Sequence, residues 1–127
     1  MASTVLIVDD SATMRGIVSH TLEEAGWAVV AAANGKEAMA LIDTQPVAMV
    51  VTDWNMPEMN GLALIQGLRA RAPFAALPIL VLTTESDDAS KQAARKAGAT
   101  GWLNKPLDAP TLVQITTTLL GAPRAHS

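Results

Sequence analysis

The sequence predicts an α/β protein with one five-stranded parallel sheet and helices on both faces. Short apolar runs alternate five times with segments whose apolar residues recur at helical spacing. Several of these runs are rich in valine and isoleucine, which is typical of strands buried on both faces. A regular alternation of strand and helix indicates parallel strands joined by right-handed crossovers.

The chain has 127 residues, half of them apolar, which fits a single domain with a substantial core. We expect this domain to span residues 1–121, with a frayed tail at residues 122–127 and no output domain. A net charge of −3 argues against a nucleic-acid binder, and the lack of cysteine excludes disulfides and thiolate metal sites. No signal peptide or membrane-length apolar run is present, so we expect a cytoplasmic protein without a membrane partner.

The first predicted strand is the apolar run Thr4–Val8, which ends at two carboxylates, Asp9 and Asp10. The hydroxyl of Ser11 can cap the helix that follows, and Gly26 is suited to end it. Six residues recur at helical spacing along that helix, five of them apolar; they are Met14, Ile17, Val18, Thr21, Leu22 and Ala25.

The second predicted strand is Trp27–Ala32, and Asn34 and Gly35 turn the chain after it. The next helix is Lys36–Thr44. Its inward residues are Ala38, Leu41 and Ile42. This short unit completes the second strand–helix step of the sheet.

The third predicted strand is Val47–Thr52, and it stops at Asp53. Pro57 and then Asn60 and Gly61 argue against a helix here and indicate a loop. Asp53 therefore follows a buried strand directly, at the end where parallel sheets bind ligands. Taken alone, Asp53 could equally well have no role in a binding site and be a solvated loop aspartate or a helix cap.

A helix is predicted over Gly61–Ala72, with Leu62, Ile65 and Leu68 along one face. The fourth strand is Pro78–Leu82, with proline confined to its first residue. Three polar residues follow this strand; they are Thr83, Thr84 and Glu85.

The fourth helix is predicted over Asp87–Ala97 and is stopped by Gly98. Its inward side is almost entirely alanine, namely Ala89, Ala93, Ala94 and Ala97. The fifth strand is Gly101–Leu103, which Asn104, Lys105 and Pro106 follow. The last helix opens at Asp108 or Ala109, and its apolar stripe is Leu112, Ile115 and Leu119.

Polar side chains follow four of the predicted strands, namely Asp9 with Asp10, Asp53, Thr83 and Lys105. In a parallel sheet these strand ends lie at one edge, so three carboxylates would repel each other there. The counter-charge could be Lys105 or a divalent cation. A set of hard oxygen ligands without histidine or cysteine favours Mg²⁺.

Carboxylates, Mg²⁺, a lysine and a hydroxyl together suit phosphoryl transfer, which depends on positioning and charge neutralisation. A carboxylate can act as the nucleophile and form an acyl phosphate, so this set predicts phosphorylation of an aspartate. Each residue also has a simpler interpretation. Asp9 and Asp10 could cap a helix, Thr83 could be an ordinary strand end, and Lys105 could be a solvated surface lysine.

Four stretches of this chain resemble response-regulator receiver domains, and most of all the stand-alone chemotaxis receivers of the CheY type. They are VDDSATMR at 8–15, DWNMPEMNG at 53–61, LPILVLTTES at 77–86 and AGATGWLNKP at 97–106. The resemblance implies the flavodoxin-like, doubly wound fold. The strand order 2-1-3-4-5 is the one known for CheY itself, and we take it from that family.

The resemblance implies that Asp53 is the phosphoacceptor. It also implies that Asp10 and Asp53 bind Mg²⁺ directly, together with the backbone carbonyl of Asn55. Asp9 would hold the metal largely through water, and Lys105 would pair with the phosphoryl oxygens.

The resemblance further implies that Thr83 hydrogen-bonds the phosphoryl group and acts as a switch with Trp102, which replaces the usual Tyr or Phe. Thr84 occupies a position that is usually very small, so its bulk could slow phosphoryl transfer or hydrolysis. Asn55 and Glu85 would also tune these rates. The bond before Pro106 would be cis.

The implied function is that of a single-domain response regulator, monomeric and without an enzyme's turnover, which assists its own phosphorylation and dephosphorylation. A CheA-like histidine kinase would supply the phosphoryl group from phosphohistidine. The surface of the fourth helix, fifth strand and fifth helix would bind a target such as a flagellar motor switch protein. A phosphate sink or a phosphorelay shuttle fits the same residues.

Two rivals belong to other classes. A phosphatase with an aspartyl nucleophile needs a second acid two residues after the nucleophile, where this chain has Asn55. A flavodoxin-like cofactor binder needs a loop that cradles phosphate after the first strand, where Asp9 and Asp10 would repel it.

Overall fold

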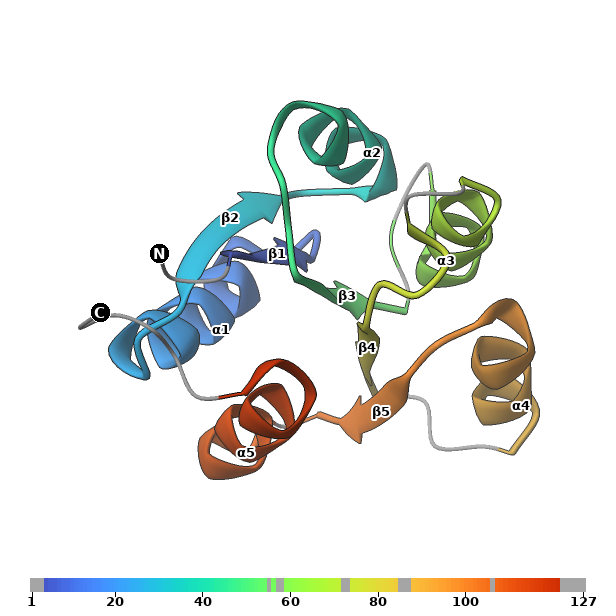
Figure 1. The fold of residues 1–127 in the computed structure, drawn as a ribbon. Coiled ribbons are helices and arrows are strands. Elements are labelled where there is room, and N and C mark those ends of the chain that lie inside the picture. Colours follow the sequence, from blue (N-terminus) through green and yellow to red (C-terminus); the bar gives the residue numbers. More distant parts are fainter. Residues whose placement is uncertain are drawn as a thin grey trace.

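The computed structural model describes residues 4–54, 56, 59–71, 74–84, 88–105 and 107–121. Strands and helices alternate along this part of the chain (Figure 1): β1 (Thr4–Val8), α1 (Ala12–Glu24), β2 (Ala28–Ala32), α2 (Gly35–Thr44), β3 (Met49–Asp53), α3 (Gly61–Arg69), β4 (Ile79–Thr83), α4 (Asp88–Ala97), β5 (Gly101–Asn104) and α5 (Ala109–Leu120). The predicted fold class is therefore confirmed.

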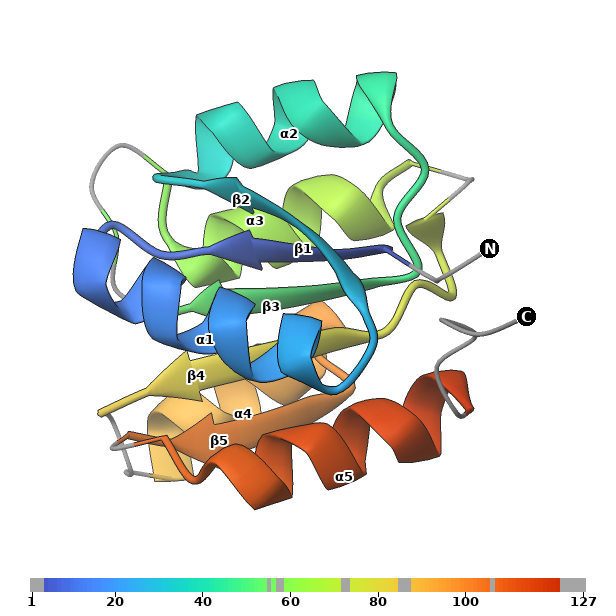
Figure 2. The same cartoon turned by 90° about the vertical axis from the view of Figure 1, so that its left-hand side faces the viewer.

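The five strands form one parallel sheet in the order β2-β1-β3-β4-β5, as the resemblance implied. Helices α1 and α5 cover one face, and α2, α3 and α4 cover the other. All the strands point toward the same edge of the molecule (Figure 2). The residues that follow β1, β3, β4 and β5 are therefore brought to that edge.

Alternate residues of the central strands pack on opposite faces of the sheet, as the strand geometry requires. Leu6, Val50 and Val81 join the core beneath α2, α3 and α4. Val5 and Leu80 join the core beneath α1 and α5. Every residue of β3 and of β4 is buried. These buried central strands hold in place the strand ends that carry the candidate site.

Side-chain caps fix where four of the helices begin. The oxygens of Ser11, Asn34, Asn60 and Asp108 each accept a hydrogen bond from the backbone N–H three residues later. The predicted cap of the first helix by Ser11 is confirmed. Gly26 follows that helix with a φ of 105°, a conformation that favours glycine.

Several element boundaries differ from the prediction. Helix α3 ends at Arg69 instead of Ala72, because Pro73 in the sequence disfavours a helical residue before it. Asp53 is the last residue of β3 itself and pairs with Leu82, so it is part of the sheet.

The inward faces of two helices also differ from the prediction. Ala89 is exposed, and Ala94 is the buried residue of α4. Ile17, expected on the apolar face of α1, is 46 % exposed. A spacing of three or four residues places side chains on one face of a helix. Which of them are buried depends on how wide a strip of that face contacts the sheet.

None of the helices in the described part of the chain combines the length and apolar character that a membrane span requires.

Candidate functional site

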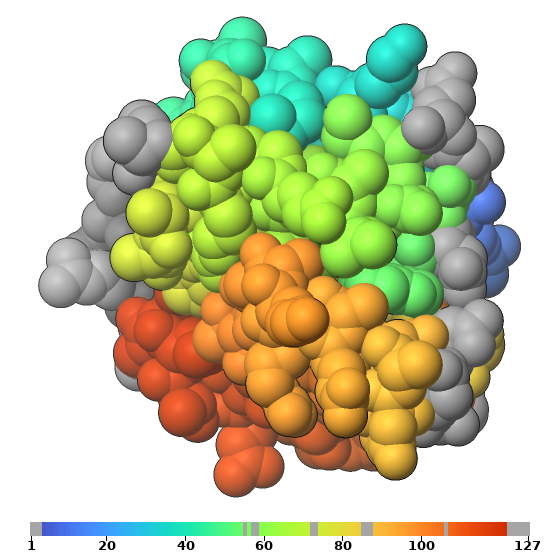
Figure 3. All heavy atoms as spheres, turned by 90° about the vertical axis from the view of Figure 1, so that its right-hand side faces the viewer, coloured from blue at the N-terminus to red at the C-terminus, as the bar shows by residue number. Residues whose placement is uncertain are grey.

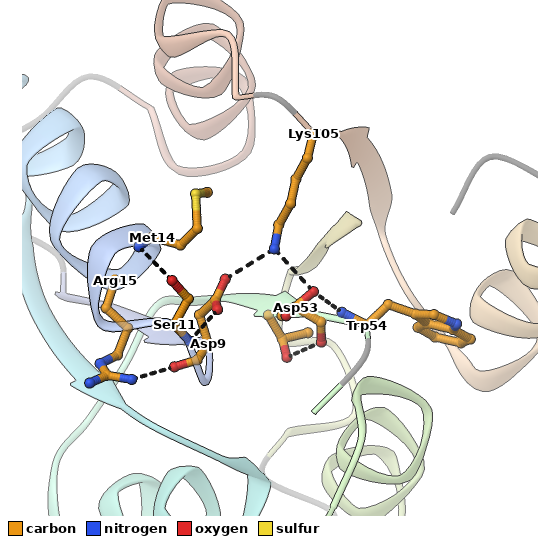
Figure 4. A network of polar contacts seen from close by, with 8 residues as sticks. Asp9, Ser11, Met14, Arg15, Asp53, Trp54 and Lys105 are labelled. Carbon is orange, nitrogen blue, oxygen red and sulfur yellow. Dashed lines mark hydrogen bonds and ion pairs between the residues drawn. The ribbon is translucent and has the colours of Figure 1, made fainter. Parts of the chain in front are cut away.

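The site lies where β1 and β3 end beside each other at one edge of the sheet (Figure 4). Asp9 follows β1 directly and is 2 % exposed, whereas Asp53 ends β3 and is 7 % exposed. Asp10 is exposed to solvent. Two carboxylates are thus held inside the fold, and a third lies at its surface.

Lys105 contacts both buried carboxylates. Its Nζ lies 3.4 Å from Oδ2 of Asp9 and 3.3 Å from Oδ1 of Asp53. The backbone N–H of Lys105 also donates to the carbonyl of Thr83, at 2.8 Å, which ties this lysine to the end of β4. The structure therefore places the predicted counter-charge between the two acids.

The geometry of the three carboxylates fits a divalent cation. One oxygen each from Asp9, Asp10 and Asp53 can be chosen so that all three atoms lie within 4.8 Å of one another. Carboxylate oxygens are the hard ligands that Mg²⁺ prefers, and the exposed Asp10 leaves room for the waters that this ion keeps. Asn55, predicted to add its carbonyl, lies outside the described residues.

Burial raises the pKa of the Asp53 carboxyl above its ordinary value, and repulsion from Asp9 adds to this effect. The positive charge and hydrogen bond of Lys105 act in the opposite direction, as does the backbone N–H of Trp54, which donates to Asp53. The net upward direction means that the charged form is held at some cost in the absence of metal. A cation bound beside these carboxylates would relieve this cost.

Gly61 allows the start of α3 to lie close against the end of β3. A Cβ at this position would lie 2.6 Å from the backbone oxygen of Asp53, closer than any real contact. The N–H of Gly61 donates to the carbonyl of Trp54 at 2.9 Å. The start of α3 therefore supports the backbone that carries the candidate phosphoacceptor.

The predicted switch residues lie beside this centre. Thr83 ends β4 and is fully buried, and Trp102 is half-buried in β5 opposite Val81. The indole of Trp102 packs on that of Trp54, with ring centroids 5.8 Å apart and planes inclined by 53°. Trp54 is bonded to Asp53, so a chain of contacts joins the acid to the indole of β5.

A pocket of about 270 Å³ borders Trp102 and is lined by residues of α4, of β5 and of the turn between them, including Lys91, Ala94 and Arg95. In the described part of the chain, the buried Nε1 of Trp102 has no hydrogen-bond partner. An unpaired buried N–H is costly, so another position of this indole or an added acceptor would be favoured.

Three predicted site residues lie outside the described part of the chain. Glu85 and Pro106 lie outside the described residues, as Asn55 does, so the tuning roles and the cis bond stay predictions. Thr84 is exposed next to the buried Thr83, so the rate effect of its bulk stays a prediction.

The sequence reasoning missed two residues that contact the site. Arg15 donates from Nη1 to the carbonyl of Asp9 at 2.7 Å, and the N–H of Ser11 donates to Oδ1 of Asp9 at 2.8 Å. The available signal was a basic residue in the first turn of a helix that starts directly after two acids. The spacing of residues along the chain does not show that the Arg15 side chain turns back to the Asp9 carbonyl.

Comparisons with known proteins agree with this geometry. Residues 5–117 match the family of the response regulator receiver domain. Chemotaxis protein CheY1 of Helicobacter pylori is 40 % identical over 119 residues, which cover 92 % of this chain and 96 % of that protein. The structure of Vibrio cholerae chemotaxis protein CheY4 superposes with a TM-score of 0.90 at 40 % identity, covering 94 % of this chain and 100 % of CheY4.

A more distant structure shares the fold. The receiver domain of sensor histidine kinase PA1611 from Pseudomonas aeruginosa superposes with a TM-score of 0.87 at 22 % identity, covering 96 % of this chain and 100 % of that one. That protein has a magnesium ion coordinated in its active site cleft.

Proposed function

This chain belongs to the family of response regulator receiver domains and is a CheY-like member of two-component signalling; from that premise we propose that it receives a phosphoryl group on Asp53 and signals in chemotaxis. The observation that carries this proposal is the buried Asp53 carboxylate with Lys105 and a second acid beside it. A histidine kinase of the CheA type is the proposed phosphoryl donor, and the cytoplasm is the proposed location.

The proposed reaction uses one oxygen of the Asp53 carboxylate as the nucleophile. This oxygen forms a bond to phosphorus while the bond between phosphorus and the donor histidine nitrogen breaks, and the imidazole leaves with its electron pair. The product is an acyl phosphate. We propose that the chain assists this transfer and the later hydrolysis without being an enzyme that turns over a separate substrate.

Residues around Asp53 provide charge and position. Lys105 lies 3.3 Å from the Asp53 carboxylate and would pair with the phosphoryl oxygens once they carry the negative charge. Thr83 at the end of β4 would donate its hydroxyl to the same group. Asp9, Asp10 and Asp53 would hold Mg²⁺, which neutralises phosphoryl charge when bound.

Incubation with acetyl phosphate and Mg²⁺ tests the acceptor. Intact-mass spectrometry should show one added phosphoryl group on the wild-type protein and none on Asp53→Asn. Asp43→Asn is the matched control, because Asp43 is an exposed aspartate paired with Arg71 away from the site. Equal labelling of wild type and Asp53→Asn would contradict the assignment of Asp53.

The proposed output is a change in the surface formed by α4, β5 and α5, which binds a protein target such as a flagellar motor switch protein. Phosphorylation would draw Thr83 toward the phosphoryl group and leave space beside it, and Trp102 would move inward. The contact between Trp54 and Trp102 supports a response of this indole to the state of Asp53.

Beryllofluoride, a mimic of the phosphoryl group, tests this output in protein labelled with fluorotryptophan. The ¹⁹F signals of Trp54 and Trp102 should shift. Trp27 should not, because it is buried in the core on the α1 and α5 side of the sheet and provides an internal control. A shift of Trp54 alone, with α4 and α5 amides unchanged, would contradict the proposed route.

A further inference from the structure

Asp10 is the least restrained of the three acids at the site. Its side chain is exposed, and in residues 4–54, 56, 59–71, 74–84, 88–105 and 107–121 no hydrogen bond or ion pair holds its carboxylate. It nevertheless lies with an oxygen within 4.8 Å of oxygens of Asp9 and Asp53. The position of its backbone therefore determines where its carboxylate can lie.

The preceding residue, Asp9, makes hydrogen bonds through its backbone N–H, its carbonyl and its carboxylate. The N–H of Asp9 donates to the carbonyl of Ala32 at 3.1 Å. Its carboxylate accepts from the N–H of Ser11 at 2.8 Å and from Lys105 at 3.4 Å. Its carbonyl accepts from Nη1 of Arg15 at 2.7 Å, and Arg15 and Lys105 approach Asp9 from two sides (Figure 4).

The carbonyl that Arg15 contacts belongs to the peptide group that joins Asp9 to Asp10. A peptide group is planar, so a bond to its oxygen also fixes the direction of the Asp10 nitrogen and the position of the Asp10 Cα. The guanidinium comes from the first turn of α1, which Ser11 caps. The helix thus provides a rigid base for this contact.

We propose that Arg15 is a positioning residue that presents the Asp10 carboxylate to the cation site by fixing the peptide between Asp9 and Asp10. This inference rests on the proposed function, in which Asp10 is a metal ligand. Arg15 would act as a partner that orients a ligand from outside the coordination sphere, through its contact with the Asp9 carbonyl.

Positioning and simple electrostatics predict opposite effects for this arginine. A guanidinium that contacts the backbone of one of these acids repels a cation bound nearby, so loss of its charge alone would tighten the binding of Mg²⁺. Loss of its hydrogen bond to the Asp9 carbonyl would release the Asp10 peptide and weaken that binding. The sign of the change therefore separates the two roles.

Calorimetric titration with MgCl₂ on the full chain measures this sign. Arg15→Met should raise the dissociation constant about tenfold, the lower end of the loss typical of orienting partners. Arg15→Lys, which keeps a charged donor, should restore most of the affinity. Lys36→Met is the charge control, because Lys36 is exposed in the first turn of α2 at the same edge of the sheet. It should leave the affinity unchanged or slightly tighter.

The rate of phosphorylation by acetyl phosphate provides a second measurement. In Arg15→Met the Mg²⁺ concentration at half-maximal rate should rise about tenfold, in line with the affinity. The rate at saturating Mg²⁺ should stay that of the wild type. Arg15→Ala, which favours the helix, replaces Arg15→Met if thermal unfolding shows the latter to be misfolded.

Two outcomes would overturn the proposal in different ways. If the wild-type protein binds Mg²⁺ and Arg15→Met binds it equally well or more tightly, the role of Arg15 is wrong and the proposed function stands. If the wild-type protein does not bind Mg²⁺, the proposed metal site fails, and the role of Arg15 fails with it.

Discussion

The β3–α3 and β4–α4 units pair with each other in the sheet and differ in how firmly their helices are held. Both strands are fully buried and both end in a polar residue of the candidate site, Asp53 or Thr83. Helix α3 buries Leu64, Ile65 and Leu68, whereas α4 buries Ala94. The exposed face that the two helices share is seen in Figure 3, with α3 in green and α4 in orange.

This difference separates a supporting element from a responsive one. The amount of apolar surface that a helix buries largely sets its contribution to stability, and alanine buries little. Elements that move during signalling are drawn from the less stable parts of a fold. Helix α3, which follows the proposed phosphoacceptor Asp53, therefore supports the candidate site, whereas α4, which follows Thr83, is the helix better suited to move in the proposed response.

The largest expected effect is the loss of a core leucine from α3. Leu64→Ala removes a fully buried side chain and leaves a cavity, which should lower the free energy of unfolding by about 2–5 kcal/mol. Chemical denaturation measures this change. Ile17→Ala, at a half-exposed position of α1, is the control and should stay within about 0.5 kcal/mol. A small loss for Leu64→Ala would remove the contrast between the two units.

The next effect concerns the link between the two helices. Arg69 of α3 donates from Nε and Nη2 to the carbonyl of Gly98, at 3.0 and 2.7 Å, and from Nη1 to that of Phe74 at 2.8 Å. Gly98 follows the end of α4, so this arginine fastens that end. Arg69→Met should cost roughly 1.5–3 kcal/mol, typical of hydrogen bonds to a charged group.

Hydrogen exchange locates this loss. Amides of α4 should lose more protection in Arg69→Met than amides of α3, because the other contacts of α3 remain. Arg95→Met removes an exposed arginine of α4 and should leave exchange nearly unchanged. Equal loss of protection in both helices would show that Arg69 supports the whole fold and not α4 in particular.

A smaller effect is expected within α4 itself. Ala94→Gly removes its buried methyl group and adds backbone freedom, which should cost about 1 kcal/mol. The beryllofluoride-dependent shifts of α4 amides should persist, since the helix needs little packing to respond. A loss as large as that of Leu64→Ala, measured by the same denaturation, would show that α4 is held as firmly as α3.

The smallest effect concerns the charge at the end of β3. Because the pKa of Asp53 is raised in the folded protein above its ordinary 3.8, the folded state takes up a proton more readily than the unfolded state. Metal-free Asp53→Asn should therefore unfold at a higher temperature than the wild type at neutral pH. This advantage should shrink as the pH falls through the raised pKa toward 3.8.

Thermal unfolding in EDTA between pH 7 and pH 4 measures this change. Glu23→Gln is the control, because it makes the same replacement of a carboxylate by an amide at an exposed position of α1. A lower unfolding temperature for Asp53→Asn at neutral pH would mean that its contact with Lys105 outweighs burial and the repulsion from Asp9. The Asp53 carboxylate would then not lower the stability of the β3–α3 unit.

The strands, the helices and the residues at the strand ends could be predicted, because they follow from the spacing of apolar residues along the chain. The strands that end at Asp53, at Thr83 and just before Lys105 could be predicted from their apolar runs, and their meeting at one edge follows from the parallel sheet. The strand order needed the family resemblance, because strand–helix alternation does not say where the first strand lies in the sheet.

The remaining features depend on the reach and direction of side chains. The contact of Arg15 with the Asp9 carbonyl, the packing of Trp54 on Trp102 and the link from Arg69 to Gly98 each join residues whose distance depends on register and rotamer. Spacing along the chain encodes none of these. The exposure of Ala89 was missed for a related reason, because α4 covers less of the sheet than its run of alanines suggested.

The position of β1 inside the sheet has a consequence for synthesis. This strand is translated before its two neighbours, β2 and β3, and a ribosome must reach Asp53 before both are complete. Until then Val5–Val8, fully apolar and buried in the finished protein, lacks at least one partner. Nascent chains that stall before residue 53 therefore expose a β-prone segment and are the forms most in need of chaperones.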